Sequence, residues 1–326
     1  MALLAQVRRL HYAIDNNSPP TPEFKTPDPK FKEPNHQRRT RIQRNESPIS
    51  ITKQAFVSHF LPLESTLSLV IPVLNQEPRL EDVLSEIQSV LAAHQPDIVV
   101  VYDVTRPDLL DAVREEQREM EERYGARSVT RTDQRGFGSA LRAGFEASRG
   151  DVVIPIMGDC SDDIAAIPRM LAAIESGADV VAGARYIAGG AIIGDDAKQQ
   201  ISRYYSKIIK ALSSVSCDDV SNSFRAYRRA VWENISNESN SFDISVEMTV
   251  KAAAQGYRVE QVPAVWTNRA VGQSHFSIMK ELPNYGRWVL YAARHAPSHF
   301  LLVALPVGVV SLVMLTGWMF GLGRRR

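Results

Sequence analysis

Three aspartates follow an apolar run, and their type and spacing fit metal chemistry best. Residues 151–157 read Asp-Val-Val-Ile-Pro-Ile-Met, and Asp159, Asp162 and Asp163 come next. The run is short, β-branched and apolar on both faces, which predicts a buried strand of a parallel sheet. Ligands bind beyond the carboxyl ends of such strands, where carboxylates can hold a divalent cation with its phosphates. Capping of the next helix by Asp162 and Asp163 is the alternative.

Alternating strands and helices must position these carboxylates. The apolar pattern predicts strands at 67–73, 98–102, 126–132, 151–156 and 179–182. It predicts helices at 79–94, 108–124, 136–148 and 165–176. This alternation is typical of an α/β fold with a mostly parallel sheet and helices on both faces. The loops that follow the strands share one rim, so we expect Glu77, Asp103, Gly136 and Asp159 to meet at one crevice.

A glycine-rich turn follows the third predicted strand. Residues 135–139, Arg-Gly-Phe-Gly-Ser, resemble a phosphate-binding turn but lack both the GxGxxG spacing and the Lys-Ser/Thr pair of a P-loop. Gly136 and Gly138 fit close packing of a helix against the sheet equally well. Both alternatives stay open from the sequence.

The second half of the chain carries the cationic counterpart of the aspartates. Further helices are predicted at 198–212 and 245–255, and a strand at 258–265. The basic residues of this half are Arg185, Arg203, Lys207, Arg225 and Arg269. As a set beside a carboxylate cluster, they suggest a site for a polyanion such as a diphosphate.

The composition gives no sign of nucleic-acid binding, a disulfide framework or a zinc site. The 326 residues are 44% hydrophobic, enough for a substantial core, and the formal net charge of +1 gives no reason to expect nucleic acid as a partner. The two cysteines, Cys160 and Cys217, form no CxxC pair, so neither a disulfide framework nor a zinc site is indicated.

The two ends of the chain differ from the middle. Residues 1–64 are rich in Pro and basic residues and are expected to form a disordered tail. Residues 278–298 are expected to form an amphipathic helix at a membrane interface, with Trp288 among its anchoring side chains. Residues 299–322 are predicted to span the membrane once, because 300–320 contain no charged residue, and 323–326 form a basic tail. The domain at 65–277 is expected on the cytoplasmic side.

Ordered motifs across residues 66–295 make the chain resemble the family 2 glycosyltransferases of the GT-A (Rossmann-like) fold, and within them the polyprenyl-phosphate, dolichol-phosphate mannose synthase-like branch. The matching segments are 69–77, 100–103, 135–145, 158–163, 183–186, 223–229 and 269–275. The segment 158–163 occupies the place of the family's metal-binding DXD motif.

This resemblance implies an inverting transfer of one sugar from a UDP- or GDP-linked nucleotide sugar to a membrane polyprenyl phosphate, assisted by Mg²⁺ or Mn²⁺. The implied catalytic residues are Asp159, Arg185 and Arg203. The implied nucleotide-sugar site is Pro72, Asn75, Glu77, Asp103, Gly136, Gly138 and Asp159. The implied acceptor-phosphate site is Arg185, Arg203, Ser206 and Arg225, and the implied metal ligands are Asp159, Ser161 and Asp162.

Three positions depart from the family's acidic pattern. Gln76, Tyr102 and Met157 stand where the family usually has acidic residues. Two alternatives therefore accompany the main prediction: a membrane-anchored family 2 transferase that acts on a glycan, and a catalytically weakened relative that binds nucleotide or lipid as a partner in a membrane complex. Assembly into a homo-oligomer is left open.

Overall fold

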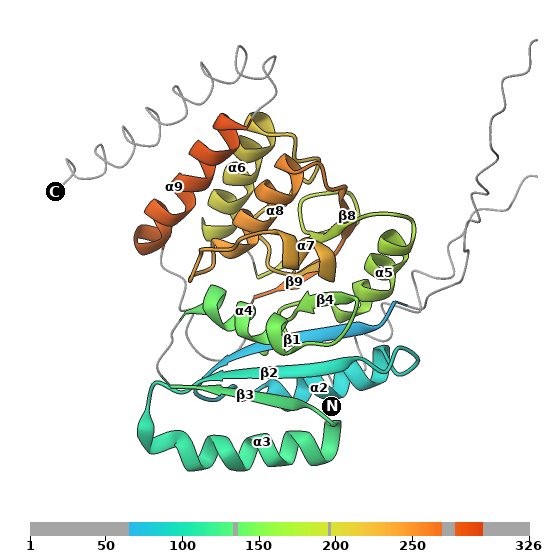
Figure 1. Ribbon diagram of the computed structural model, residues 1–326, viewed down its shortest axis with the longest axis vertical. Coiled ribbons are helices and arrows are strands. Elements are labelled where there is room, and N and C mark those ends of the chain that lie inside the picture. Colours follow the sequence, from blue (N-terminus) through green and yellow to red (C-terminus); the bar gives the residue numbers. More distant parts are fainter. Residues whose placement is uncertain (1–64, 133–135, 195–196, 269–277, 296–326) are drawn as a thin grey trace, which may run out of the picture. The chain divides into compact units, whose positions relative to one another are not determined.

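The structure is a computed structural model that describes residues 65–132, 136–194, 197–268 and 278–295 (Figure 1). Its main sheet has seven strands in the order β3-β2-β1-β4-β7-β5-β8. These strands are β1 (Leu67–Leu74), β2 (Asp97–Asp103), β3 (Arg127–Arg131), β4 (Val152–Pro155), β5 (Val180–Ala184), β7 (Arg225–Arg228) and β8 (Val259–Pro263). The short strands β6 (Ala191–Ile193) and β9 (Val265–Thr267) form a separate parallel pair.

Helices cover both faces of the sheet, as predicted. They are α2 (Leu80–Val90), α3 (Leu110–Tyr124), α4 (Phe137–Ala147), α5 (Ile167–Glu175), α6 (Ala197–Leu212), α7 (Arg229–Asn234), α8 (Ile244–Ala254) and α9 (Ile278–Arg294), with short 3-10 helices η1 (Pro107–Leu109) and η2 (Ile164–Ala166). Figure 1 shows α2 and α3 on the side of β1–β3 opposite α4.

Alternating side chains of β1 and β2 separate the two layers of the core. Leu69 and Ile71 pack in the cluster that includes the apolar residues of α2 and α5, whereas Val70 packs in the cluster that includes those of α4, α6 and α8. Because successive side chains of a strand point to opposite faces, a strand that is buried on both faces must be apolar throughout. The continuous apolar runs in the sequence are therefore central strands.

Strand β7 is the main difference from the predicted fold. It lies antiparallel between β4 and β5, with Tyr227 opposite Val153 and Ala226 opposite Val181. The segment Arg225–Arg228 has an arginine at each end and only four residues, so it has no apolar run that would predict a strand. The remainder of the sheet is parallel, which confirms the mostly parallel architecture.

Helix α9 packs against α6 and α8 as part of the domain. Trp288 is 4% exposed and belongs to the same core cluster as α4 and α8, so its prediction as a membrane anchor is wrong. The predicted tail at 1–64 and the predicted span at 299–322 lie outside the described residues. Within the described ranges, none of the helices has the length and apolar character needed to cross a membrane.

Candidate active site

The carboxyl ends of β1, β2, β3 and β4 bring the predicted donor-site residues together. Glu77 follows β1, and a Cβ atom placed on Gly158 would lie 3.2 Å from its Cγ. Asp103 ends β2 and is 5% exposed, and it receives a backbone hydrogen bond from Gly136. Pro72 lies within β1 and is partly buried. Glu77 therefore meets the acidic turn and Asp103 meets the glycine turn, as the shared rim of the loops predicts.

Asp103 is held by a residue that the sequence reasoning missed. The Nε of Arg131 lies 2.9 Å from Oδ1 of Asp103, within ion-pair distance but poorly aligned for a hydrogen bond. Arg131 also donates to Oγ of Ser139, at 2.8 Å, in the first turn of α4. Burial raises the pKa of Asp103, while Arg131 and the Gly136 N–H act in the opposite direction. Arg131 ends β3, so the same rule about strand ends would have found it.

Asn75 shapes the crevice by binding the neighbouring loop. Its φ is +59°, in the left-handed region that Asn tolerates better than most residues. Its Oδ1 accepts the backbone N–H groups of Thr105 and Arg106, at 2.8 and 3.2 Å, and its own N–H donates to the carbonyl oxygen of Asp103. Asn75 therefore fixes the ends of β1 and β2 to each other, and its contact with a nucleotide stays a prediction.

Two positions that depart from the family's pattern contact α3. Nε2 of Gln76 donates to Oε2 of Glu116 at 3.0 Å, and the Tyr102 hydroxyl donates to Oε1 at 3.3 Å. Tyr102 is fully buried, and burial raises its pKa far above the ordinary value. These residues support the packing of α3 on the sheet.

The acidic turn after β4 is tightly folded. Cys160 has φ of +60°, so the chain reverses sharply just after Asp159. Asp159 accepts the N–H of Ser161 at 3.1 Å, and Asp162 accepts the N–H of Met157 at 2.8 Å. Oδ2 of Asp163 accepts the N–H of Val265, at 3.1 Å, in β9. No side-chain capping bond forms at the start of η2, so the helix-cap alternative is wrong for Asp162 and Asp163.

Burial and neighbouring charge distinguish Asp162 from its neighbours. The pKa of Asp162 is raised to about 7: burial is the largest cause and the Asp159 carboxylate also raises it, while the Met157 N–H and Arg185 act in the opposite direction. A divalent cation between the two carboxylates would remove their repulsion. Mg²⁺ is commonly bound by one or two carboxylates together with substrate phosphates. That Asp159 and Asp162 share such a cation stays a prediction.

These two carboxylates do not make a site of protein ligands alone. Within the part of the chain that the structure describes, no group of three or more His, Cys, Asp or Glu side chains could hold a metal ion. Ser161 is 3% exposed, and its carbonyl oxygen accepts the N–H of Thr267. Its role as a metal ligand stays a prediction.

The glycine turn is shaped by close approach of another loop. A Cβ atom on Gly136 would lie 2.3 Å from the carbonyl oxygen of Asn240, and one on Gly138 would lie 2.5 Å from that of Ser239. The N–H of Gly138 already donates to Asn240, at 3.0 Å. Both glycines therefore make room for this loop and not for the sheet, and contact of either glycine with a nucleotide stays a prediction.

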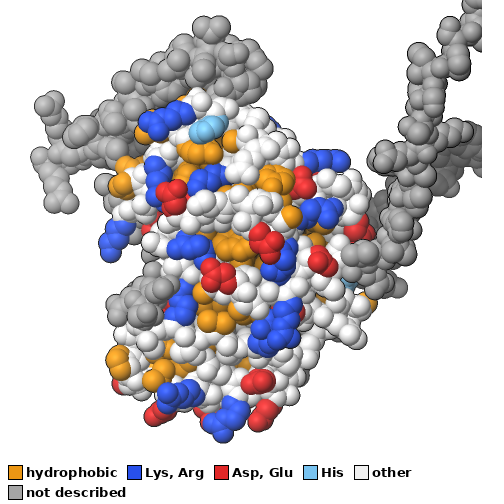
Figure 2. Space-filling model, in the orientation of Figure 1, with side chains coloured by type: hydrophobic (Ala, Val, Ile, Leu, Met, Phe, Trp, Pro, Cys, Tyr) orange, Lys and Arg blue, Asp and Glu red, His pale blue; other side chains and the backbone are white. Residues whose placement is uncertain are grey.

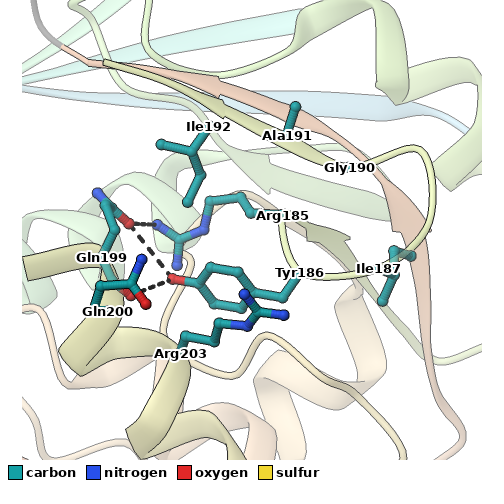
Figure 3. A pocket seen from close by; sticks show the side chains of 9 residues that line it. All are labelled: Arg185, Tyr186, Ile187, Gly190, Ala191, Ile192, Gln199, Gln200 and Arg203. Carbon is teal, nitrogen blue, oxygen red and sulfur yellow. Dashed lines mark hydrogen bonds between the residues drawn. The ribbon is translucent and has the colours of Figure 1, made fainter. Parts of the chain in front are cut away.

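A polar pocket of about 350 Å³ lies between the loop that follows β5 and the start of α6 (Figure 3), and one of its residues, Arg185, lowers the pKa of Asp162 in the acidic turn. It is lined by Arg185, Tyr186, Ile187, Gly190, Ala191, Ile192, Gln199, Gln200 and Arg203. Figure 3 shows the Tyr186 ring between the side chains of Arg185 and Arg203, whose guanidinium carbons lie 4.9 and 5.8 Å from the ring centroid. Gln199, Gln200 and Arg203 lie in the first two turns of α6, where the helix dipole favours an anion.

The guanidinium of Arg185 is hydrogen-bonded to neighbouring protein side chains. Its Nε and Nη2 donate to the two carboxylate oxygens of Asp219, at 2.7 and 2.9 Å, and its Nη1 donates to Gln199 at 2.9 Å. Burial alone would raise the pKa of Asp219, but Arg185 outweighs this and lowers it. Because Asp219 neutralises Arg185, the exposed Arg203 carries the net positive charge among the described side chains that line the pocket. Asp219 escaped the sequence reasoning because it belongs to no motif.

Two predicted acceptor residues lie inside the protein. Ser206 is 0% exposed, and its hydroxyl accepts the N–H of Val220 at 3.2 Å. Arg225 is also 0% exposed, and its guanidinium donates to the carbonyl oxygens of Asn222 and Asp219. Both side chains hold the segment that precedes β7. The prediction that they contact an acceptor phosphate is wrong, because packing directs them away from the pocket.

The fold and the crevice define a class of protein. Residues 68–236 match the model of glycosyl transferase family 2, which is more than half of the chain. The chain therefore belongs to this family, as the motifs predicted.

Relatives with established names extend the comparison. A dolichol-phosphate mannosyltransferase from Pyrococcus furiosus is 29% identical over 218 residues, which cover 64% of this chain and 58% of that protein. A polyprenol monophosphomannose synthase from Mycolicibacterium smegmatis is 29% identical over 66% of this chain and 82% of its own. The match thus spans less than two thirds of the archaeal relative's length.

A solved structure shares the fold. Glucosyl-3-phosphoglycerate synthase from Mycobacterium tuberculosis, in complex with Mn²⁺, uridine diphosphate and phosphoglyceric acid, superposes with a TM-score of 0.51 at 17% identity. The alignment covers 72% of this chain and 80% of that one. At this identity the likeness establishes the GT-A fold alone.

Proposed function

We propose that the protein transfers a single sugar, with inversion, from a UDP- or GDP-linked nucleotide sugar to a membrane polyprenyl phosphate. The observation that supports the proposal is the basic pocket, because one of its residues, Arg185, is near enough to lower the pKa of Asp162 in the acidic turn. In this proposal the pocket takes the acceptor monophosphate, and the acidic turn takes the donor diphosphate with its metal. The names of the mannosyltransferase relatives support a polyprenyl phosphate as the acceptor.

The chemistry needs little from a general base. A phosphate monoester is largely dianionic near neutral pH, so the acceptor is already a nucleophile. Of the described residues, the only histidines are His94 and His295, and both are exposed outside the crevice. In this proposal Arg203 binds the acceptor phosphate, while Arg185, held by Asp219, forms the wall of the pocket and orients Tyr186.

The donor side supplies orientation and charge. Asp103 and Glu77 hold the nucleotide at the ends of β2 and β1. Asp159 and Asp162 would hold Mg²⁺ or Mn²⁺, which supplies stabilisation of the negative charge on the departing nucleoside diphosphate. Asp159 is therefore the residue on which turnover should depend most.

A membrane location is part of the proposal. Helices α6 and α9 pack together, and each exposes large apolar side chains, namely Ile201, Tyr204, Leu282 and Leu290. Figure 2 shows basic and hydrophobic side chains intermixed on the face in view, including the end that carries α6 and α9. Such a mixture suits a surface that meets anionic lipid. With the predicted span at 299–322, it would bring the pocket to a lipid headgroup.

Reconstitution tests the proposal directly. The purified full chain in lipid vesicles is supplied with labelled UDP- and GDP-sugars and Mn²⁺, with and without polyprenyl phosphate. We expect label in the organic phase only when polyprenyl phosphate is present, and its loss in Asp159→Asn. Label that enters only water-soluble glycan would show the glycan alternative, and nucleotide binding without turnover would show the weakened relative.

A further inference from the structure

A loop between α7 and α8 connects the C-terminal helix to the glycine turn. This loop comprises residues 236–243, and buried side chains of α8 hold it in place. The fully buried carboxylate of Glu247 accepts the N–H groups of Glu238 and Ser239, both at 2.8 Å. Lys251 donates to Glu247 at 2.7 Å and to the carbonyl oxygen of Ser236 at 2.5 Å. The base of the loop is therefore fixed by charged, buried groups.

On one side the loop is held by α9. Oδ2 of the fully buried Asp243 accepts three hydrogen bonds, from Oγ of Ser239 at 2.7 Å, Nη2 of Arg287 at 2.8 Å and Nε1 of Trp288 at 2.8 Å. Arg287 also donates to the Ser239 hydroxyl, at 2.6 Å. Charge-assisted bonds of this kind are about twice as strong as neutral ones. The position of Ser239 thus depends on α9.

On the other side the same loop presses against the glycine turn. The carbonyl oxygen of Asn240 accepts the Gly138 N–H, and the Arg142 guanidinium donates to the Ser239 carbonyl and the Asn240 side chain. The Phe137 and Phe242 rings stack with centroids 4.7 Å apart. Gly136 has φ of +114°, a conformation that is accessible to glycine but is only one of several that it can adopt. The shape of the turn is therefore set by the loop that contacts it.

We propose that α9 holds the glycine turn in its donor-binding conformation through the 236–243 loop, and that Asp243 and Arg287 are positioning residues for the donor nucleotide. The proposal rests on the proposed function in one respect, which is that the turn from Gly136 to Gly138 contacts the donor. It makes donor affinity depend on how α9 is seated, although α9 supplies no contact to the nucleotide itself.

Amide hydrogen exchange on the full chain tests the mechanical part without any ligand. In Arg287→Gln the contacts to Asp243 and Ser239 are weakened at a partly exposed side chain, so the fold should survive. We expect faster exchange at the Gly138 amide and unchanged exchange across β1 to β3. The matched control is Arg294→Gln, on an exposed position of the same helix, which should leave the Gly138 amide unchanged. Unchanged exchange at Gly138 in Arg287→Gln would overturn the inference.

Affinity for UDP and GDP in the presence of Mn²⁺ tests the functional part. We expect Arg287→Gln to weaken binding of the preferred nucleotide by about five- to tenfold, the lower range of coupling between sites, with the KM for lipid unchanged. Ser241→Ala, which loses its bond to Glu281, should change both readouts in the same direction. Faster exchange with unaltered nucleotide affinity would refute the positioning role. If none of the proteins, wild type included, bound either nucleotide, the proposed function would fail. The exchange rate at the Gly138 amide would still test whether α9 holds the glycine turn.

Discussion

Arg185 and Arg203 lie on either side of one tyrosine, but they differ in their surroundings. Arg185 is buried and its charge is offset by Asp219, whereas Arg203 is exposed and forms no ion pair with any described residue. Among the described side chains that line the pocket, a phosphate would therefore meet one uncompensated cation, Arg203. In the proposed function Arg203 binds the phosphate, whereas Arg185 is part of the wall of the pocket.

Replacement of Arg203 by glutamine should separate acceptor binding from donor binding. Loss of a charge-assisted bond to a phosphate is worth about 1.5–3 kcal/mol, or roughly 10- to 100-fold in the KM for polyprenyl phosphate. Nucleotide affinity should stay unchanged. Lys207→Gln, one turn further along the exposed face of α6, is the control and should have a much smaller effect on this KM. Equal effects of the two variants would place the phosphate elsewhere.

Asp219→Asn should destabilise the fold by about 3–5 kcal/mol, because it leaves the Arg185 charge buried without a partner. The control is Asp218→Asn, whose exposed pair with Lys210 is worth less than about 1 kcal/mol. The pKa of Asp219 is lowered in the folded state, so its contribution is present at neutral pH and is lost as the pH falls from the ordinary value through the lowered one. Denaturant unfolding from pH 7 to 3 measures both effects, and equal costs for the two variants would contradict this assignment.

The crevice was more predictable than the pocket. Asp103, Glu77 and Asp159 each lie at or just after the end of a strand. The carboxyl ends of parallel strands share one edge of the sheet, so such residues come together whatever the details of packing. The directions of Ser206 and Arg225 depend instead on how α6 and the segment before β7 pack against the sheet, and that is tertiary information. Their residue types alone suit a phosphate site as well as a buried network, which is why the sequence misassigned them.

At the scale of single elements, the fit of α4 on the sheet depends on a glycine. A Cβ atom on Gly144 would lie 2.2 Å from Cγ1 of Val70 and 3.0 Å from Cγ2 of Val101. The absence of a side chain lets the helix approach β1 and β2 closely. The start of α4 carries the glycine turn, so this approach also sets the position of the turn.

Gly144→Ala should therefore destabilise the protein by about 1–3 kcal/mol through overpacking. Gly125→Ala is the comparison, because its φ of +66° is strained for alanine but nothing lies within 4 Å of the added Cβ. Its cost should be about 1 kcal/mol and should come from the backbone alone. Donor affinity should fall in Gly144→Ala and not in Gly125→Ala. Thermal unfolding with nucleotide titration distinguishes the two, and the reverse order of affinities would refute the role of α4.

Strands and helices with a strong apolar period were predictable, and those without one were not. The runs that became β1, β2 and β4 are buried on both faces along most of their length, so their centres are continuous apolar stretches with few polar residues. Strand β7 and the β6–β9 pair are three or four residues long, and their pairing depends on partners far along the sequence. Trp288 shows the same limit, since the period of α9 reveals an apolar face but not whether lipid or protein covers it.

At the scale of the whole molecule, the proposed membrane location predicts two modes of attachment. The full chain should float with vesicles irrespective of salt, because the predicted span at 299–322 would hold it in the bilayer. A chain that ends after His295 should bind only anionic vesicles, through α6 and α9, and high salt should release it. Vesicle flotation at low and high salt measures both. A full chain that salt releases from vesicles would contradict the predicted span.

The place of β7 in the sheet also affects the order in which the protein can fold. Strand β4 is bordered by β1 on one side and by β7 on the other, yet β7 is not synthesised until the ribosome reaches Arg225. Until then the free edges of β4 and β5 expose unpaired backbone groups, which are templates for aggregation. Pairing across so long a stretch of chain is slow, because the chain loses the entropy of loop closure before the strand contacts stabilise it. The nascent chain should therefore depend on chaperones most between the synthesis of β4 and that of β7.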